Sequence, residues 1–263
     1  MDKSKRTFLT VAGLGGVGTY LGIKGAYVHA NKVPKAKKRY VMVINTKLCT
    51  SDVMAAAMAA CHRTHNVPHI SNPNCDKAPP EKQSVKWIWD EKFDDAFPEQ
   101  VHHMPKVAKR PLLVLCNHCD EPPCVRVCPT QATWKRASDG IVTIDMHRCI
   151  GCRYCIAGCP YGSRSFNFRD PRKYLKFVEA NYPTRSHGVV EKCNFCVERL
   201  GKGQKPACVE ACERLGSKAL QFGALTKKNL GEETSEIAKV IRNNFSLRRK
   251  PGLGTGPEVY YIL

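Results

Sequence analysis

Residues 116–129 read CNHCDEPPCVRVCP, and residues 149–160 read CIGCRYCIAGCP. The first stretch spaces its cysteines as C-x2-C-x4-C-x3-C-P, and the second as C-x2-C-x2-C-x3-C-P. These cysteines belong to a total of 15 in a chain of 263 residues, which is far above ordinary usage. The fold therefore has to be explained from the chemistry of these two stretches.

Three chemistries compete for so many cysteines: disulfides, zinc and iron–sulfur clusters. Disulfide scaffolds are typical of short secreted chains, and an odd cysteine count fits them poorly. Zinc sites use paired C-x2-C units, so a third and fourth cysteine at x2 and x3 are unlike a zinc spacing. The second stretch instead has the spacing of bacterial ferredoxins, in which three thiolates hold one [4Fe-4S] cluster and the fourth reaches the other cluster. The spacing therefore predicts iron–sulfur clusters, with a zinc-binding module as the remote alternative.

This crossover rule predicts the ligands of three [4Fe-4S] clusters. Cluster 1 is expected to be held by Cys116, Cys119, Cys124 and Cys159. Cluster 2 is expected to be held by Cys149, Cys152, Cys155 and Cys128. A third group, spaced C-x2-C-x11-C-x3-C, lacks its crossover partner, and Cys61 is the natural donor because it follows a predicted helix and precedes a loop. Cluster 3 is therefore expected to be held by Cys193, Cys196, Cys208 and Cys61.

A fourth cluster would need a complete cysteine run around residues 51–61. Ser51, Met54 and Ala57 stand where its cysteines would be. The remaining thiols, Cys49, Cys75 and Cys212, could in principle form a remodelled fourth site, but we favour buried free thiols, which pack as small apolar groups. The alternative of an enzyme subunit requires a catalytic cluster that lacks one cysteine ligand. Only this incomplete set of three cysteines could hold such a cluster.

The formal net charge of +19, with a pI of about 9.4, would by itself suggest nucleic acid or an anionic membrane surface. Cysteinyl [4Fe-4S] clusters are themselves anions, however, and basic residues lie beside the cysteine runs: Arg126, Arg148, Arg153 and Arg164. We therefore expect no nucleic-acid partner. No C-x-x-C-H occurs, which argues against covalent haem in this chain, and no nucleophile with its base is present, so we expect no catalytic residues.

The first 30 residues are predicted to be a targeting segment. Lys3, Lys5 and Arg6 precede a modestly apolar run, and Ser4–Leu9 resembles the twin-arginine export motif with Lys5 in place of its first arginine. An ordinary secretory signal and a retained anchor are the alternatives. A basic linker is expected at 31–39. These features predict an exported protein, periplasmic or on the extracytoplasmic face of the cytoplasmic membrane, and associated with the membrane through partners or a retained anchor.

The rest of the chain is predicted to be α+β, with the first half of an outer ferredoxin-like unit at 40–106, an inner unit at 107–170 and the second outer half at 171–263. Strands are expected at 40–45 and 112–115, a hairpin turning at Asp139-Gly140, and a strand at the C-terminus. Helices are expected at 51–60, ending at Cys61-His62, and on the surface at 235–245. Residues 66–106 are expected to form an irregular insert whose Trp87-Ile88-Trp89 packs in the core. His62, His65 and His69 are expected to be hydrogen-bonded surface or interface residues.

The strings CNHCDEPPCVRVCPTQAT, CIGCRYCIAGCPYGSRSFNFRDPR and CNFCVERLGKGQKPACVEAC resemble the four-motif electron-transfer subunits of the dimethyl-sulfoxide and polysulfide reductase group. The resemblance covers most of the chain from residue 40. It implies two intertwined ferredoxin-like units, of which the outer one contains the Cys61 and Cys193 regions. ACHRTHNVP, VKWIW and VYYIL narrow the resemblance to DsrO subunits of the sulfite-reduction-associated DsrMKJOP membrane complex.

The resemblance implies a polytopic quinone-interacting membrane partner (NrfD/DsrP-like) and, for the DsrO type, a multihaem cytochrome c (DsrJ-like). The expected function is a relay of single electrons between them through [4Fe-4S] clusters, without a substrate site. The alternative is the same role in another molybdopterin oxidoreductase-type complex that reduces polysulfide, tetrathionate or nitrite.

Overall fold

The computed structural model describes residues 33–36, 38–68, 83–175, 177–226 and 235–263. Nearly all of these lie in one unit, Pro34–Leu263, and the other unit is Met1–Val33. The predicted targeting segment, Cys75 and His69 lie outside the described residues. Among the described residues, no helix is long and apolar enough to cross a membrane.

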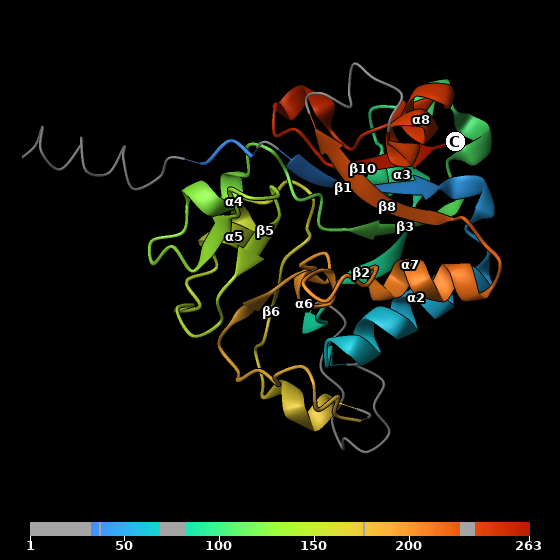
Figure 1. The fold of residues 1–263 in the computed structure, drawn as a ribbon. Helices are drawn as coiled ribbons and strands as arrows, with labels where there is room; N and C mark the ends of the chain where they lie inside the picture. Colours follow the sequence, from blue (N-terminus) through green and yellow to red (C-terminus); the bar gives the residue numbers. More distant parts are fainter. Residues whose placement is uncertain (1–32, 37, 69–82, 176, 227–234) are drawn as a thin grey trace, which may run out of the picture. The chain divides into compact units, whose positions relative to one another are not determined.

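A four-stranded sheet joins segments from both ends of the described chain (Figure 1). Its strand order is β8 (Leu220–Thr226), β1 (Lys38–Asn45), β10 (Val259–Ile262) and β9 (Ser246–Leu247). β1 pairs antiparallel with β8 and parallel with β10. The strands predicted at 40–45 and at the C-terminus are therefore confirmed, and they are neighbours.

Both faces of β1 are covered, which explains its continuous apolar sequence. Side chains alternate across a strand, so Met42 and Ile44 enter the main core while Val41 and Val43 enter a smaller one. The smaller core is closed by α8 (Glu236–Asn243), whose Ile237 and Ala238 are buried. The helix predicted at 235–245 is confirmed, and one of its sides packs on the sheet.

The helices α2 (Ser51–Thr64) and α7 (Ala207–Arg214) pack side by side (Figure 1). Thr50 caps α2 by accepting a hydrogen bond from the Val53 amide at 3.4 Å. The buried residues of α2 share one side of the helix: Val53, Met54, Ala57 and Cys61. The predicted end of α2 at Cys61-His62 falls two residues short.

The part of the predicted irregular insert that the structure describes is ordered into short elements, so that prediction was wrong for residues 83–106. β2 (Ile88–Lys92) pairs antiparallel with β3 (Pro111–Leu115), and α3 (Phe93–Ala96) follows. Two 3-10 turns, Val101–His103 and Pro105–Val107, complete it. Burial of Trp87 and Ile88 anchors this segment, as the core-packing interpretation predicted.

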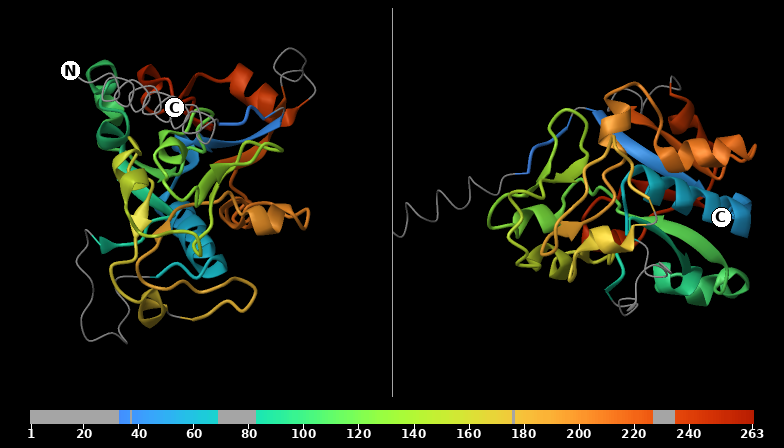
Figure 2. Two further views of the ribbon diagram at one scale, coloured as in Figure 1. Left: turned by 90° about the vertical axis from the view of Figure 1, so that its left-hand side faces the viewer. Right: turned by 90° about the horizontal axis from the view of Figure 1, so that it is seen from below.

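The segment between β3 and β8 contains short elements and long connections (Figures 1 and 2). The helices α4 (Pro123–Arg126) and α5 (Tyr154–Ala157) pack together beside the hairpin of β4 (Thr133–Lys135) and β5 (Val142–Ile144). The predicted hairpin is confirmed. β6 (Ser165–Phe166) pairs with β7 (Val190–Glu191), which leads into α6 (Val197–Leu200). Further 3-10 turns lie at Thr46–Leu48, Pro171–Tyr174 and Pro251–Leu253.

Candidate metal centres

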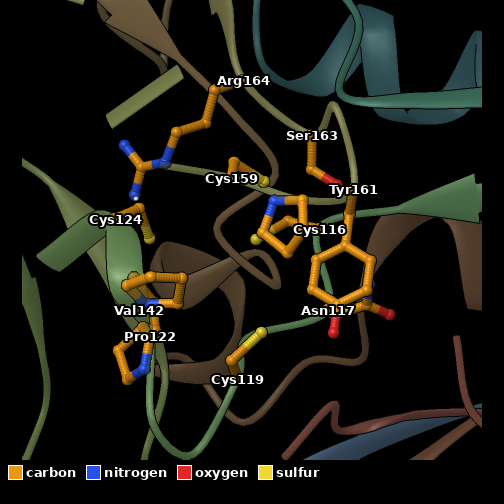
Figure 3. A pocket seen from close by; sticks show the side chains of 12 residues that line it. Cys116, Asn117, Cys119, Pro122, Cys124, Val142, Cys159, Tyr161, Ser163 and Arg164 are labelled. Carbon is orange, nitrogen blue, oxygen red and sulfur yellow. Dashed lines mark hydrogen bonds between the residues drawn. The ribbon is translucent and has the colours of Figure 1, made fainter. Parts of the chain in front are cut away.

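Four cysteines line a first pocket, here called the hollow of set 1. We call them set 1: Cys116, Cys119, Cys124 and Cys159. Figure 3 shows their sulfurs turned towards the same space, with the guanidinium of Arg164 beside Cys124. The four residues predicted for cluster 1 therefore line one cavity, although the chain separates the first from the last by a complete hairpin.

The C-terminal segment holds the first cysteine loop in place. The amides of Asp120 and Glu121 donate to the carbonyl oxygens of Gly256 and Thr255 at 2.8 and 2.9 Å. The Glu258 amide donates to the Asn117 carbonyl at 2.8 Å. β10 follows directly, so the pairing of β10 with β1 ties set 1 to the central sheet.

Burial raises the pKa of the Cys119 thiol, and the charge of Cys116 raises it further. The pKa of Cys159 is raised by the same two causes in the same order. Buried thiolates crowded in this way repel one another, so they ionise together only when they bind a cation.

A second pocket is lined by the residues predicted for cluster 2. We call them set 2: Cys128, Cys149, Cys152 and Cys155. Cys152 is exposed, so this set reaches the protein surface. Gly151 has a φ of +69°, and a Cβ there would lie under 3.0 Å from the Gly188 carbonyl oxygen. This turn of the loop therefore requires glycine.

The four cysteines predicted for cluster 3 are all buried, and we call them set 3: Cys61, Cys193, Cys196 and Cys208. Burial raises the pKa of Cys61 well above its usual range, and the charges of the other three members raise it further. Cys61 comes from α2 and Cys208 from the adjacent helix α7. The packing of these two helices thus brings together thiols that are far apart in the sequence.

The three C-x-x-C loops share one backbone feature. In each loop the residue before the second cysteine has a positive φ: His118 at 43°, Gly151 at 69° and Phe195 at 54°. Turns of this kind gather backbone amides into anion-binding concavities, which many iron–sulfur sites use. In set 3 the Phe195 amide donates to the Cys193 sulfur at 3.4 Å. The repeated turn indicates the same kind of site at all three places.

Set 1 adjoins both other sets, and we call the order set 2, set 1, set 3 the row: Cys124 shares a small buried cluster with Cys155, and Cys116 packs against the main core that contains Cys193. Burial raises the pKa of Cys155 in set 2, the Arg164 guanidinium lowers it, and the charge of Cys124 in set 1 raises it. The pKa of Cys193 in set 3 is raised by burial and then by the charge of Cys116 in set 1. Set 1 therefore has a member close to each of the other two sets.

Two of the remaining cysteines, Cys49 and Cys212, lie in the described chain, and Cys212 is close enough to Cys208 of set 3 to raise its pKa. Burial raises the pKa of Cys49 to about 11, and the charge of Cys212 raises it as well. Burial also raises the pKa of Cys212 to about 11. The Cys49 thiol donates to the Asn45 carbonyl at 3.3 Å, and both cysteines belong to the main apolar core. The described part of the predicted fourth site is thus a pair of buried thiols.

His65 is buried against set 3, contrary to the expectation of a surface or interface position. Its Nδ1 lies 3.0 Å from the Cys61 carbonyl oxygen, and its ring stacks on Trp87. Burial lowers the pKa of His65, but the neighbouring Cys196 and Glu198, whose carboxylate lies 3.8 Å from Nε2, outweigh burial and raise the pKa to about 9. The i−4 contact with Cys61 at the end of α2 places His65 here.

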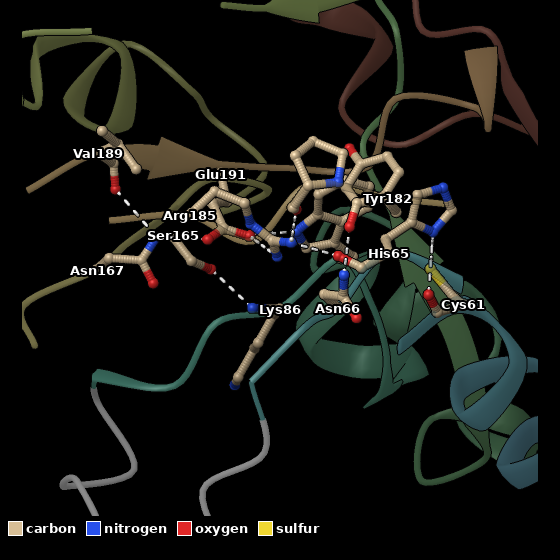
Figure 4. Close-up of polar contacts among 12 residues, drawn as sticks. Cys61, His65, Asn66, Lys86, Ser165, Asn167, Tyr182, Arg185, Val189 and Glu191 are labelled. Carbon is tan, nitrogen blue, oxygen red and sulfur yellow. Dashed lines mark hydrogen bonds and ion pairs between the residues drawn. The ribbon is translucent and has the colours of Figure 1, made fainter. Parts of the chain in front are cut away.

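A buried ion pair supports the same region (Figure 4). The Arg185 guanidinium donates to Glu191 at 2.5 Å and to the His65 carbonyl oxygen. Glu191 also accepts from the Trp87 indole at 3.0 Å and from the Asn167 amide. This network connects β7, and through it the loop of Cys193, to the chain that follows α2. No sequence pattern indicates it, because its members come from four separate segments.

The four arginines that stand beside the cysteine runs have different environments. Arg126 and Arg148 are exposed and pair with Glu121 and Asp145. Arg153 lies over the rings of Phe166 and Phe168 at 5.4 and 5.8 Å. Arg164 alone among the four is buried, and its Nη2 donates to the Cys124 sulfur at 3.1 Å.

Lys192, a buried residue that the sequence reasoning did not single out, lies next to Cys193. Its Nζ donates to the carbonyl oxygens of Cys193, at 2.8 Å, and Val142. His118, in the first C-x-x-C loop, stacks on Phe195 with ring centroids 3.7 Å apart. Burial, together with the charges of Lys192 and Arg164, holds the pKa of His118 well below its usual range, so its imidazole is neutral. The sequence offers one signal for Lys192: it directly precedes Cys193 and closely follows the apolar pair Val189-Val190.

These residues fit [4Fe-4S] clusters, which are held by four cysteine thiolates each. Each set supplies four thiols, and the buried Nη1 of Arg164 at set 1 lacks a hydrogen-bond partner among the described residues. Within the described chain, no three His, Cys, Asp or Glu side chains lie close enough together to hold a single metal ion. A four-iron cluster does not need that geometry, because each of its thiolates binds a different iron.

Comparison with known proteins agrees with this site. The family model described as "4Fe-4S dicluster domain" matches residues 112–173 and 177–224. The chain is 39% identical over 280 residues to the Hdr-like menaquinol oxidoreductase iron-sulfur subunit 1 of Archaeoglobus fulgidus, covering 98% of this chain and 97% of the relative. It is 34% identical over 264 residues to protein NrfC of Escherichia coli K12, covering 100% and 96%.

A third relative is the menaquinone reductase iron-sulfur cluster-binding subunit of Nitratidesulfovibrio vulgaris, which is 34% identical over 245 residues, covering 86% of this chain and 89% of the relative. The model match supports a ferredoxin-like iron–sulfur fold with [4Fe-4S] clusters. Identity of this extent along nearly whole chains establishes a common family. The chain belongs to the NrfC-type family of [4Fe-4S] electron-transfer subunits, which are non-catalytic components of redox complexes.

Proposed function

We propose that this protein relays single electrons through three [4Fe-4S] clusters, one in each of sets 1, 2 and 3. The observation that carries the proposal is the row of three four-cysteine sets, each with the same turn in its C-x-x-C loop. A bound [4Fe-4S] cluster accepts and releases one electron at a time. The cysteine thiolates hold the irons, and the burial of all four cysteines of set 3 keeps water away from the cluster there.

We further propose that the fold is a doubled ferredoxin with intertwined units. Two arrangements support this: α4 packs on α5 around sets 1 and 2, whereas α2 packs on α7 around set 3. β1 and β8 pair with each other although the whole inner segment separates them in the sequence. At the position of a fourth cluster, Met54 and Ala57 are buried in the same main core as Cys212. Apolar packing there supports a count of three clusters.

The proposed partners follow from the relatives and from the resemblance described above. Two relatives are named for menaquinol oxidation and menaquinone reduction, so we propose a quinone-interacting membrane subunit as one partner. A multihaem cytochrome c is the proposed second partner, as in the DsrO type of subunit. The same role in a tetrathionate-reducing complex is the alternative, since a tetrathionate reductase component of Salmonella typhimurium is 41% identical over 56% of this chain.

Set 2 is the proposed place of electron exchange with a partner at one end of the row. Cys152 is exposed there, and the neighbouring Ile150 and Tyr154 are 67% and 63% exposed. Large exposed apolar side chains beside a redox site favour contact with another protein. Set 3 is the proposed exchange point at the other end. The twin-arginine-like segment at residues 1–30 supports the proposal that the relay works on the extracytoplasmic face of the membrane.

Replacing Cys152 by serine tests the proposed site directly. Cys152→Ser is expected to abolish the cluster in set 2 and to lower the iron content by about four per chain, because a [4Fe-4S] cluster is held by four cysteines. Iron analysis and EPR of the anaerobically reduced protein measure the loss. Electron transfer to a partner at this end is expected to fall with it.

Cys49→Ser is the matched control, because its hydroxyl can still donate to the Asn45 carbonyl as the thiol does. Its iron content is expected to equal that of the wild-type protein. Unchanged iron and unchanged electron transfer in Cys152→Ser would contradict the assignment of set 2.

A further inference from the structure

Five lysine and arginine side chains are buried among the described residues: Lys135, Arg164, Arg185, Lys192 and Arg249. Three of them are paired with carboxylates, namely those of Asp120, Glu191 and Glu91. Arg164 and Lys192, which are 5% and 1% exposed, have no carboxylate oxygen within 4.0 Å in the part of the chain that the structure describes. Burying a charge without a counter-charge is costly. These two side chains therefore require a negative partner other than a described carboxylate.

Arg164 lies where set 1 meets set 2. Its Nη2 donates to the sulfur of Cys124, in set 1, at 3.1 Å and to the Thr133 hydroxyl at 2.9 Å. Its charge also acts on Cys155, in set 2. The Nη1 of the same guanidinium is buried and finds no acceptor among the described residues. The Arg164 guanidinium thus interacts with both set 1 and set 2, and its Nη1 remains available to donate a further hydrogen bond.

Lys192 lies where set 1 meets set 3. Its Nζ donates to the carbonyl oxygen of Cys193, in set 3, at 2.8 Å. It also donates to the carbonyl oxygen of Val142, a residue that lines the hollow of set 1. Both acceptors are neutral, so they satisfy its hydrogen bonds without balancing its charge.

We propose that Arg164 and Lys192 are the fixed counter-charges of the cluster row, one at each junction, and that they raise the reduction potentials of the two clusters on either side. The inference rests on the proposed function, since it requires clusters in all three sets. Reduction adds one negative charge to a cluster, and a nearby buried cation stabilises that charge with little screening by salt. Cluster 1 lies beside both cations, so both are expected to raise its reduction potential.

The test is an EPR-monitored redox titration of the purified, iron-replete protein and its variants. Arg164→Gln is expected to lower the midpoint potentials of clusters 1 and 2 and to leave that of cluster 3 in place. Lys192→Gln is expected to lower the midpoint potentials of clusters 1 and 3 and to leave the midpoint potential of cluster 2 unchanged. The signals are assigned with Cys152→Ser, which lacks cluster 2, and with Cys61→Ala, which lacks cluster 3.

Two kinds of control separate charge from packing. Arg126→Gln removes the same charge only two residues from Cys124, but Arg126 is exposed and paired with Glu121, so no shift is expected. Arg164→Lys and Lys192→Arg keep the charge and are expected to restore most of each shift. If a glutamine variant fails to retain iron while its charge-conserving counterpart retains it, the counter-charge role is supported. Loss of iron in both the glutamine variant and the charge-conserving variant would overturn the counter-charge role and show that the side chain acts through packing.

The proposal is also overturned if the glutamine variants hold wild-type iron with unchanged potentials, or if each variant shifts all three clusters equally. That result would leave the proposed function intact, because the three clusters would still be present. A wild-type protein without clusters would instead contradict the proposed function itself.

Discussion

Cys61→Ala is expected to remove cluster 3, and with it about four of about twelve irons, while clusters 1 and 2 remain. Cys61 is the only predicted ligand of set 3 that lies outside the third cysteine group, and the packing of α2 on α7 brings it there. Alanine offers no ligand atom and leaves the helix intact. Because set 3 is one end of the row, electron transfer through the protein is expected to fall to background.

The measurement combines iron analysis, EPR of the reduced protein and steady-state electron transfer between a quinol and the partner. Cys212→Ala is the matched control, since Cys212 is also buried and lies one helical turn from Cys208 in α7. It is expected to retain all the iron. The opposite pattern, with iron lost from Cys212→Ala and kept by Cys61→Ala, would show that the ligands of set 3 are assigned wrongly.

Glu191→Ala is expected to lower the free energy of unfolding by about 3–5 kcal/mol, the usual effect of breaking a buried ion pair by removing one partner. Glu191 is fully buried and accepts hydrogen bonds from Arg185, Trp87 and Asn167. Its removal would leave a buried guanidinium uncompensated and two further donors unpaired. The change is read from the guanidinium midpoint, followed anaerobically by tryptophan fluorescence, and from the rate at which cluster absorbance is lost.

Glu213→Ala is the control for this prediction. Glu213 forms an exposed ion pair with Lys205 at 2.6 Å, and such pairs contribute only about 0–1 kcal/mol. Its midpoint is expected to stay close to that of the wild type. Equal midpoints in the two variants would mean that the Glu191 network does not support the fold around set 3.

The sequence predicts the local parts of this fold well. The structure contains the predicted hairpin turning at Asp139-Gly140 and the predicted strands at 40–45 and at the C-terminus. These elements could be predicted because alternating apolar residues and turn residues encode them locally. The structure also brings together each predicted set of four cysteines, including the crossover member Cys61. Ligand spacing constrains such sets strongly, since only a few cysteine positions can reach one cluster.

Other features depend on tertiary contacts and could not be predicted from the sequence. The ordered elements β2 and α3 exist because Trp87 and Phe93 are buried against distant segments, which local propensity does not reveal. Four arginines beside the cysteine runs look alike in the sequence, yet only Arg164 is buried against a cysteine sulfur. His65 was expected at the surface or an interface because it follows the predicted end of a helix, whereas its position one turn after Cys61 buries it against set 3.

The central claim is that the chain carries three [4Fe-4S] clusters and relays electrons through them. Iron and acid-labile sulfide analysis with EPR on anaerobically prepared protein tests it most directly. Three clusters would give about twelve irons and about twelve sulfides per chain, with EPR signals from three reducible clusters. About sixteen irons would contradict the count by restoring a fourth cluster, and a colourless protein containing zinc would contradict the account as a whole.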